Sequence, residues 1–134
     1  MAIWTFYDYV SEDGTNEIEA WIDRLQQSTT VRARLKTLLD HLQDVKGLET
    51  DAYVEPLTGD CSGLLAIKFT VNKVRHRPMF FKGPEEGEAT ILVGAKKAGR
   101  DTYEPRRACQ IGLARQGEVE AHRERVAEHD YVKR

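Results

Sequence analysis

The seventeen residues "LAIKFTVNKVRHRPMFF", Leu65 to Phe81, decide the fold of this chain of 134 residues. In the first half of the stretch, apolar residues alternate with small or polar ones, and a period of two predicts a half-buried β-strand. Asn72 and Lys73 are expected to turn the chain into a second strand, about Lys73 to Phe81. A glycine-containing loop then leads to a third strand, "ATILVGA", Ala89 to Ala95. The stretch therefore predicts a meander of three strands.

The residues before the meander predict one strand and two helices. "IWTFYDYV", Ile3 to Val10, is aromatic-rich and alternating, which is typical of a strand. Apolar residues spaced by three and four predict amphipathic helices over Asn16–Gln27 and about Val31–Val45, with "STT" as the break between them. Two helices joined so tightly are expected to form an antiparallel hairpin. The predicted core joins these helices to the first meander strand, through Trp21, Ile22, Leu25, Leu35, Leu38, Leu39, Leu42, Ile67, Phe69 and Val71.

The order of predicted elements indicates the fold class. Pro105 predicts the first turn of a helix over about Tyr103–Glu118. The order β-α-α-β-β-β-α favours an α+β fold, with the helices packed on one face of a small, mainly antiparallel sheet and the first two of them forming the hairpin. We expect a single domain over residues 1–118. Residues 119–134 have almost no apolar stripe, so we expect a polar C-terminal extension, either helical and solvated or frayed.

Composition and cysteine usage indicate the class of protein. With 40% hydrophobic and 31% charged residues, the chain is typical of a soluble globular domain. No apolar run is long enough to cross a membrane, and the N-terminus lacks the pattern of a signal peptide. Cys61 and Cys109 have no motif spacing, so they are expected to be free, reduced thiols of a cytoplasmic protein. No metal-ligand spacing or glycine-rich phosphate loop indicates a metal or cofactor.

Charge is segregated along the chain. Residues 64–82 hold five Lys or Arg and no acid, whereas residues 8–23 hold six acids and no Lys or Arg. Strand alternation puts Arg75 and Arg77 on one face and His76 on the other. Lys68 opposes the apolar face of its strand, so Lys68, Arg75 and Arg77 can share a surface that binds phosphate. The alternative is an ordinary solvated face. His76 is expected to be a packed, hydrogen-bonded histidine at the edge of the core.

Four motifs in the second half of the chain resemble those of the RelE/ParE toxin superfamily, and most of all its HigB-type, phage-derived branch. "EPLTG" followed by "GLLAIKF" resembles the Pro-Leu-x-Gly of that family before a strand ending in a basic residue, here Lys68. "VRHRPMFF" resembles its second meander strand, with His76-Arg77 in place of an aromatic-Arg pair. "ILVGAKK" and "YEPRRACQIGLA" resemble its third strand and its Pro-started helix. The sequence departs from the pattern at Ala66, where many members have Glu, and at Pro78.

The resemblance implies the toxin of a type II toxin-antitoxin system. Such a protein is cytoplasmic, is held by a cognate antitoxin, and cleaves mRNA on the ribosome without metal or cofactor. The 2′-hydroxyl would attack the adjacent phosphate, which Lys68 and Arg77 would orient and neutralise with help from Lys96 or Lys97. Tyr103 would stack on a base or donate a proton. The other cations that we expect to bind RNA are Lys73, Arg75, Lys97 and Arg100.

Several alternatives stay open at this point. Efficient cleavage requires a general base, and the sequence does not identify it. The chain is therefore alternatively a non-catalytic interaction module, either a gyrase inhibitor of the ParE type or an inactive phage-derived remnant. Lys96 and Lys97 are equally well explained as a solvated pair, and Tyr103 as a packing residue. Some toxins of this group place a catalytic His or Tyr near the C-terminus, and "EHDY" at 128–131 allows this, although a frayed end is the favoured interpretation.

Overall fold

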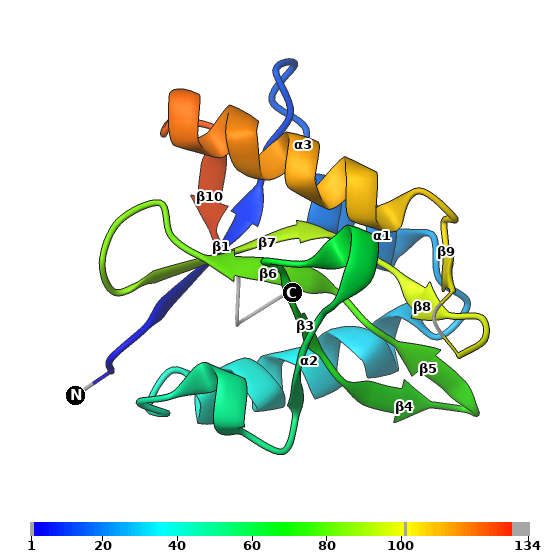
Figure 1. The fold of residues 1–134 in the computed structure, drawn as a ribbon. Coiled ribbons are helices and arrows are strands. Elements are labelled where there is room, and N and C mark those ends of the chain that lie inside the picture. Colours follow the sequence, from blue (N-terminus) through cyan, green and yellow to red (C-terminus); the bar gives the residue numbers. More distant parts are fainter. Residues whose placement is uncertain (1, 101, 130–134) are drawn as a thin grey trace.

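The computed structural model describes residues 2–100 and 102–129 (Figure 1). Among the helices of this described part, none is long and apolar enough to cross a membrane. The elements, in chain order, are β1 (Thr5–Tyr9), α1 (Glu17–Asp23), α2 (Ser28–Leu42), the 3-10 turn η1 (Leu48–Thr50), β2 (Val54–Pro56), the 3-10 turn η2 (Gly59–Cys61), β3 (Leu65–Ile67), β4 (Phe69–Val71), β5 (Val74–His76), β6 (Met79–Lys82), β7 (Glu88–Val93), β8 (Lys96–Lys97), β9 (Tyr103–Glu104), α3 (Ala108–Ala121) and β10 (Val126–Glu128).

The main sheet runs through the middle of the molecule between layers of helix (Figure 1). Its six strands lie in the order β10-β1-β7-β6-β3-β2. β1 and β7 pair in parallel, with Thr5 opposite Glu88 and Asp8 opposite Ile91, and the other neighbours are antiparallel. The predicted α+β class is therefore confirmed.

The third predicted meander strand is confirmed as β7, but the first two are not continuous: each is divided between two sheets. A second sheet has the order β4-β5-β8-β9. The first predicted strand leaves the main sheet for this one, the second returns from it, and the chain leaves again after β7 to form β8. The chain changes sheet at Lys68, at the Arg77–Pro78 step, and at Gly94–Ala95. Pro78 has no N–H to give to a ladder, so a regular strand is interrupted there. Its carbonyl still accepts a hydrogen bond from the Ile67 N–H at 2.9 Å.

α1 and α2 cover one face of the main sheet and build the core that the sequence predicts. Asn16 caps α1, because its side-chain oxygen accepts hydrogen bonds from the N–H groups of Ile18 and Glu19. α1 is shorter than predicted, and α2 begins at Ser28, so "STT" is its first turn and not a break. Burial of each large apolar side chain stabilises the fold by roughly 1.5–3 kcal/mol. The buried residues include Ile22, Leu35, Leu38, Leu39, Leu42, Ile67, Phe69 and Val71, and Trp21 and Leu25 pack against them.

α3 lies on the opposite face of the main sheet, so the prediction that the helices share one face is wrong (Figure 1). The residues that α3 itself buries are all small or medium-sized: Ala108, Cys109, Gly112 and Val119. Gly112 allows the close approach, because a Cβ at this position would lie 2.9 Å from Cδ1 of Leu64. A helix that packs through small residues has a weak apolar stripe, which explains why the sequence pattern did not show which face of the sheet α3 covers.

The start of α3 differs from the prediction at Pro105. Tyr103 and Glu104 form β9, and residues 105–107 make a turn in which the Ala108 N–H donates to the Pro105 carbonyl at 3.0 Å. The helix therefore begins after this turn, at Ala108 and not at Tyr103.

The prediction of free thiols is also wrong, because Cys61 and Cys109 form a disulfide. Their Cα atoms are 4.8 Å apart, within the range that a disulfide spans, and they are 48 residues apart in the sequence. The bond ties η2 to the first turn of α3. The cysteines therefore no longer indicate a reducing compartment, and the cytoplasmic location stays a prediction.

The predicted solvated or frayed tail is wrong for residues 119–129. α3 continues to Ala121, and β10 then pairs antiparallel with β1, with Tyr7 opposite Glu128. His129 is buried, and its backbone N–H donates to the Phe6 carbonyl at 3.0 Å. The C-terminal segment thus forms the edge of the main sheet. Asp130 and Tyr131 of the "EHDY" motif lie outside the described residues.

Candidate active site at the junction of the two sheets

Arg77 and Glu55 form a charged pair where the two sheets meet. Arg77 lies between β5 and β6, and Glu55 lies on β2. Nε of Arg77 is 3.6 Å from Oε1 of Glu55, and the Arg77 Nη1 donates to the carbonyl of His76 at 2.8 Å. The side chain of Arg77 is 11% exposed and that of Glu55 is 32% exposed. The pair therefore presents a partly open carboxylate beside a guanidinium that the fold holds in place.

The electrostatics of Arg77 identify its neighbours. Burial lowers the pKa of the Arg77 guanidinium, Glu55 opposes this shift, Arg75 adds to it, and Tyr103 opposes it. The side chain stays protonated near neutral pH, because arginine does not lose its proton in proteins. Arg75, Tyr103 and Glu55 thus all lie close enough to influence the same cation.

Strand register explains how these side chains meet. In the second sheet, His76 lies opposite Lys96, and Lys97 lies opposite Tyr103. Alternation then places Arg75, Arg77, Lys97 and Tyr103 on one face. Lys68 lies between Ile67 and Phe69, which both point into the core below α1 and α2, so alternation places Lys68 on the other side, with Ala66. The structure therefore brings together Arg75, Arg77, Lys97 and Tyr103, with the half-buried Lys68 on the same side.

Lys96 lies on the opposite face of the second sheet, with His76. The His76 ring packs 5.4 Å from the Phe69 ring and 5.9 Å from the Trp21 ring, so its predicted packing is confirmed. Its Nδ1 makes no hydrogen bond within the described residues. Burial lowers the pKa of His76, and the nearby charges of Lys96 and Arg77 lower it further. Lys96 is thus separated from the face that carries Arg77 and Tyr103.

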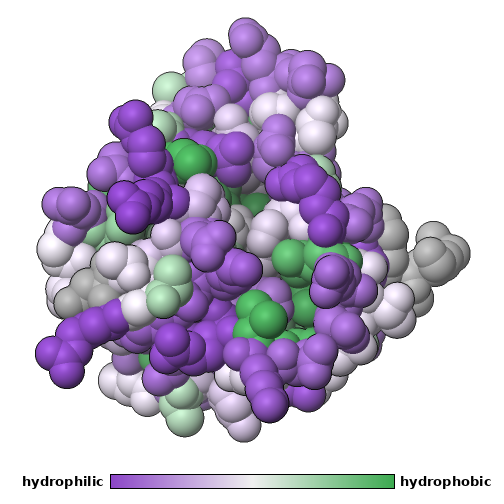
Figure 2. Space-filling model, turned by 90° about the vertical axis from the view of Figure 1, so that its right-hand side faces the viewer, coloured by the Kyte–Doolittle hydropathy of each residue, from purple (hydrophilic) through white to green (hydrophobic). Residues whose placement is uncertain are grey.

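The side of the molecule that carries the second sheet is mostly hydrophilic, with a small hydrophobic patch set in a hollow (Figure 2). A pocket of about 340 Å³ on the His76 face is lined by Trp21, Leu25, Val71, His76 and Lys96, among others. A second pocket, of about 570 Å³, opens beside Tyr103 and is also lined by Asp60, Arg106 and the disulfide. Tyr103 therefore borders a space large enough for a nucleobase.

Lys73 and Arg100 lie at the margins of the second sheet. Lys73 sits in the predicted turn, which is confirmed: Asn72 and Lys73 have φ of 49° and 70°, and Val71 pairs with Val74. Two left-handed residues between paired strands are typical of a type I′ hairpin. Arg100 lies in the loop between β8 and β9, and both cations are exposed. They extend the charged surface and do not take part in the Glu55–Arg77 pair.

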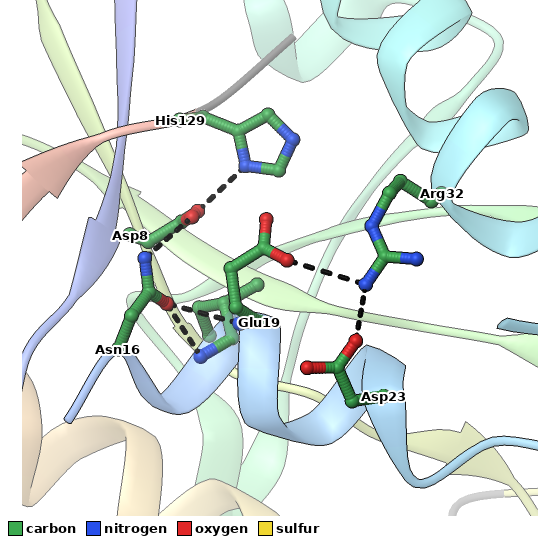
Figure 3. Close-up of polar contacts among 7 residues, drawn as sticks. Asp8, Asn16, Glu19, Asp23, Arg32 and His129 are labelled. Carbon is green, nitrogen blue, oxygen red and sulfur yellow. Dashed lines mark hydrogen bonds and ion pairs between the residues drawn. The ribbon is translucent and has the colours of Figure 1, made fainter. Parts of the chain in front are cut away.

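A second charged cluster, absent from the sequence predictions, lies at the other end of the main sheet (Figure 3). Nδ1 of His129, after β10, is 2.8 Å from Oδ1 of Asp8 on β1, and both residues are buried. The Asn16 amide donates to Oδ2 of Asp8 at 3.1 Å. Glu19, on α1, lies 3.2 Å from Nη2 of Arg32, which also contacts Asp23 at 2.5 Å.

No family model, curated protein or solved structure matches this chain. Membership of the RelE/ParE superfamily therefore stays a prediction. Of the residues that matter at the candidate site, Glu55 lies within the quoted motif "EPLTG" but received no role, because a lone Glu before a strand gives no local signal. Its position beside Arg77 depends on the pairing of β2 with β3.

Proposed function

We propose that this chain is a metal-independent endoribonuclease of RelE-like topology, the toxin of a type II toxin-antitoxin system that acts on mRNA at the ribosome. The observation that supports this most is the Glu55–Arg77 pair next to Tyr103. RNA cleavage by its own 2′-hydroxyl requires a base, a cation that stabilises the phosphorane, and an acid for the leaving group. A carboxylate, a guanidinium and a phenol at one place supply these roles.

The proposed reaction assigns one step to each group. The Glu55 carboxylate takes the proton of the 2′-hydroxyl, and the resulting oxygen attacks the adjacent phosphorus. Arg77 stabilises the negative charge that develops on the phosphoryl oxygens. The bond from phosphorus to the 5′-oxygen breaks, and Tyr103 gives this oxygen its proton. The products are a 2′,3′-cyclic phosphate and a 5′-hydroxyl.

The surrounding cations would bind the RNA backbone. Arg75 is exposed and Lys97 is half-buried on the face of Arg77, and Lys68 lies on the same side. Charged donors of this kind bind phosphate oxygens more strongly than neutral ones do. The pocket beside Tyr103 gives a base room to stack on the phenol ring. A cognate antitoxin would inhibit the enzyme by covering this surface with acidic side chains.

An inducible expression experiment tests the proposal in a bacterium. The wild-type chain should arrest growth and shorten translated mRNAs, whereas Glu55→Gln should do neither while accumulating to the same level. Glu86→Gln, at an exposed glutamate in the loop before β7, is the matched control and should behave like the wild type. Cleavage that is equally fast in Glu55→Gln would rule out Glu55 as the base.

The same experiment separates the non-catalytic alternative. The observation in its favour is the burial of Arg77 and its bond to the His76 carbonyl, which are also expected of a structural arginine. Growth arrest with intact mRNA and a DNA-damage response would indicate a gyrase inhibitor. Normal growth with intact mRNA, from a folded and abundant protein, would indicate an inactive remnant.

A further inference from the structure

The cluster of Asp8, Glu19 and His129 has the donor set of a metal site. These residues offer two carboxylate oxygens and one imidazole nitrogen, and the three ligand atoms all lie within 4.8 Å of one another. Zn–N and Zn–O bonds of about 2.0–2.2 Å place neighbouring ligand atoms about 3–4 Å apart. Nδ1 of His129 and Oδ1 of Asp8 are 2.8 Å apart, which is already close to this spacing of neighbouring ligand atoms. Only a small movement of Glu19 is therefore required.

The charges around the cluster favour a divalent cation. Asp8, Glu19 and Asp23 contribute three carboxylates, and Arg32 contributes one guanidinium that contacts the last two of these acids. Three negative charges against one positive charge leave an excess of two when His129 is neutral. Burying carboxylates without compensation is costly, and Asp8 is fully buried. A divalent ion balances this excess.

The neighbouring residues hold the donors in position, as in known metal sites. Asn16 donates to Oδ2 of Asp8 and leaves Oδ1 turned toward His129, while its own oxygen accepts from the first turn of α1 (Figure 3). Arg32 contacts Oε1 of Glu19 and so helps to hold this carboxylate near Asp8 and His129. The cluster therefore joins β1, α1 and the residue after β10, which are far apart in the sequence.

We propose that Asp8, Glu19 and His129 bind a divalent transition-metal ion of the Zn²⁺ type, which fastens the C-terminal strand to β1 and α1. Imidazole and carboxylate together suit Zn²⁺ better than Mg²⁺ or Ca²⁺, which prefer oxygen ligands alone. A ligating imidazole nitrogen must be unprotonated, so a neutral His129 would carry its single ring proton on Nε2 when the ion binds at Nδ1. The ion enters when β10, a three-residue edge strand, opens locally. This site is separate from Glu55 and Arg77 and does not depend on nuclease activity.

Metal titration of the full chain tests the proposal after treatment with a chelator and dialysis. Zn²⁺ alone should bind in a 1:1 ratio by calorimetry. At a free concentration one hundred times the Kd, it should raise the melting temperature by roughly 5–10 °C. Co²⁺ in place of Zn²⁺ should give visible absorption bands, a readout that does not rely on stability. A structural metal site has a Kd so low that about 100 µM of the ion would saturate it. If the wild-type chain binds neither ion at this concentration, the proposal is wrong.

Two ligand variants and one control make the assignment specific. Glu19→Gln keeps the shape of the side chain, and His129→Ala removes the imidazole; both should weaken Zn²⁺ binding at least about tenfold and reduce the Co²⁺ bands. His122→Ala is the control, because His122 is an exposed histidine seven residues earlier in the sequence. It should bind like the wild type. If Glu19→Gln binds Zn²⁺ with unchanged affinity, or if His122→Ala loses binding, the assignment is wrong. A lower melting temperature for His129→Ala without metal, with no difference in metal affinity, would show that the cluster is only a structural contact.

Discussion

The two charged clusters of the molecule differ in how completely the fold encloses them. At one end of the main sheet, Asp8 and His129 are in direct contact at 2.8 Å, with side chains 0% and 1% exposed. At the other end, Glu55 and Arg77 are 3.6 Å apart, and Glu55 keeps about a third of its surface in solvent. An enclosed cluster can hold an ion or stabilise the fold, but it cannot reach a polymer. A carboxylate at the surface beside a fixed cation can act on one.

The largest expected effect separates the two clusters by stability. Asp8→Ala should lower the free energy of unfolding by about 3–5 kcal/mol, because it removes the buried carboxylate that His129 contacts. Glu55→Ala should cost less, about 1–3 kcal/mol, because Glu55 is partly solvated and Arg77 keeps its bond to the His76 carbonyl. Urea denaturation of both variants in the presence of a chelator measures the difference. Equal losses would mean that the two clusters are equally structural.

The disulfide should affect the Glu55 end of the molecule more than the Asp8 end. Replacing Cys61 and Cys109 by Ser together should lower the free energy of unfolding by about 2–4 kcal/mol, because the crosslink restricts the unfolded chain. Cys109 is in the first turn of α3, next to the pocket that Tyr103 lines, so hydrogen exchange should rise there and stay unchanged at β10. A cytoplasmic toxin must remain folded in this reduced form. An unfolded double variant at 37 °C would argue against the cytoplasmic location.

The pH dependence of stability should report on the histidine behind Arg77. His76 has a lowered pKa in the folded protein, so the unfolded chain binds more protons as the pH falls below about 6.5. The neutral His76 ring therefore makes its full contribution to the free energy of unfolding above pH 6.5. This contribution is lost as the pH falls through the lower pKa of the folded state. His76→Gln should flatten the melting temperature between pH 7 and 5. A variant that keeps the full wild-type slope would show that other groups cause it.

The apolar core on the α1 and α2 face could be predicted from the sequence because its signal is local. Leucines at helical spacing in α2 and alternating residues at 65–71 both point to one shared face, and the structure confirms this. The opposite face could not be predicted in the same way. The helix on that face buries only small or medium-sized residues and approaches the sheet at Gly112, and in a sequence a glycine indicates only a weak helix former.

The candidate sites were less predictable, because they are made by pairing between distant segments. Alternation put Arg75 and Arg77 on one face, and the two charges are close enough to interact. It could not show that β2 brings Glu55 beside Arg77 or that Lys96 pairs with His76. Asp8 and His129 are 121 residues apart and meet only because β10 pairs with β1. The break at Pro78 was visible in the sequence, but its consequence, a change of sheet, depends on the tertiary fold.

The smallest expected effect concerns the exposed cations around Glu55 and Arg77. Arg75→Ala should weaken binding of single-stranded RNA and reduce the slope of log affinity against log salt by about 0.7, the value for one lost phosphate contact on a single strand. Its melting temperature should hardly change, because an exposed charge contributes under about 1 kcal/mol. Lys46→Ala, an exposed cation in the segment after α2, is the control and should leave both quantities unchanged. If Arg75→Ala and Lys46→Ala bind RNA with the same affinity and the same salt slope, the cations of the second sheet are ordinary solvated residues. The cluster of Glu55 and Arg77 would then differ from the cluster of Asp8 and His129 in exposure alone, and not in its capacity to bind RNA.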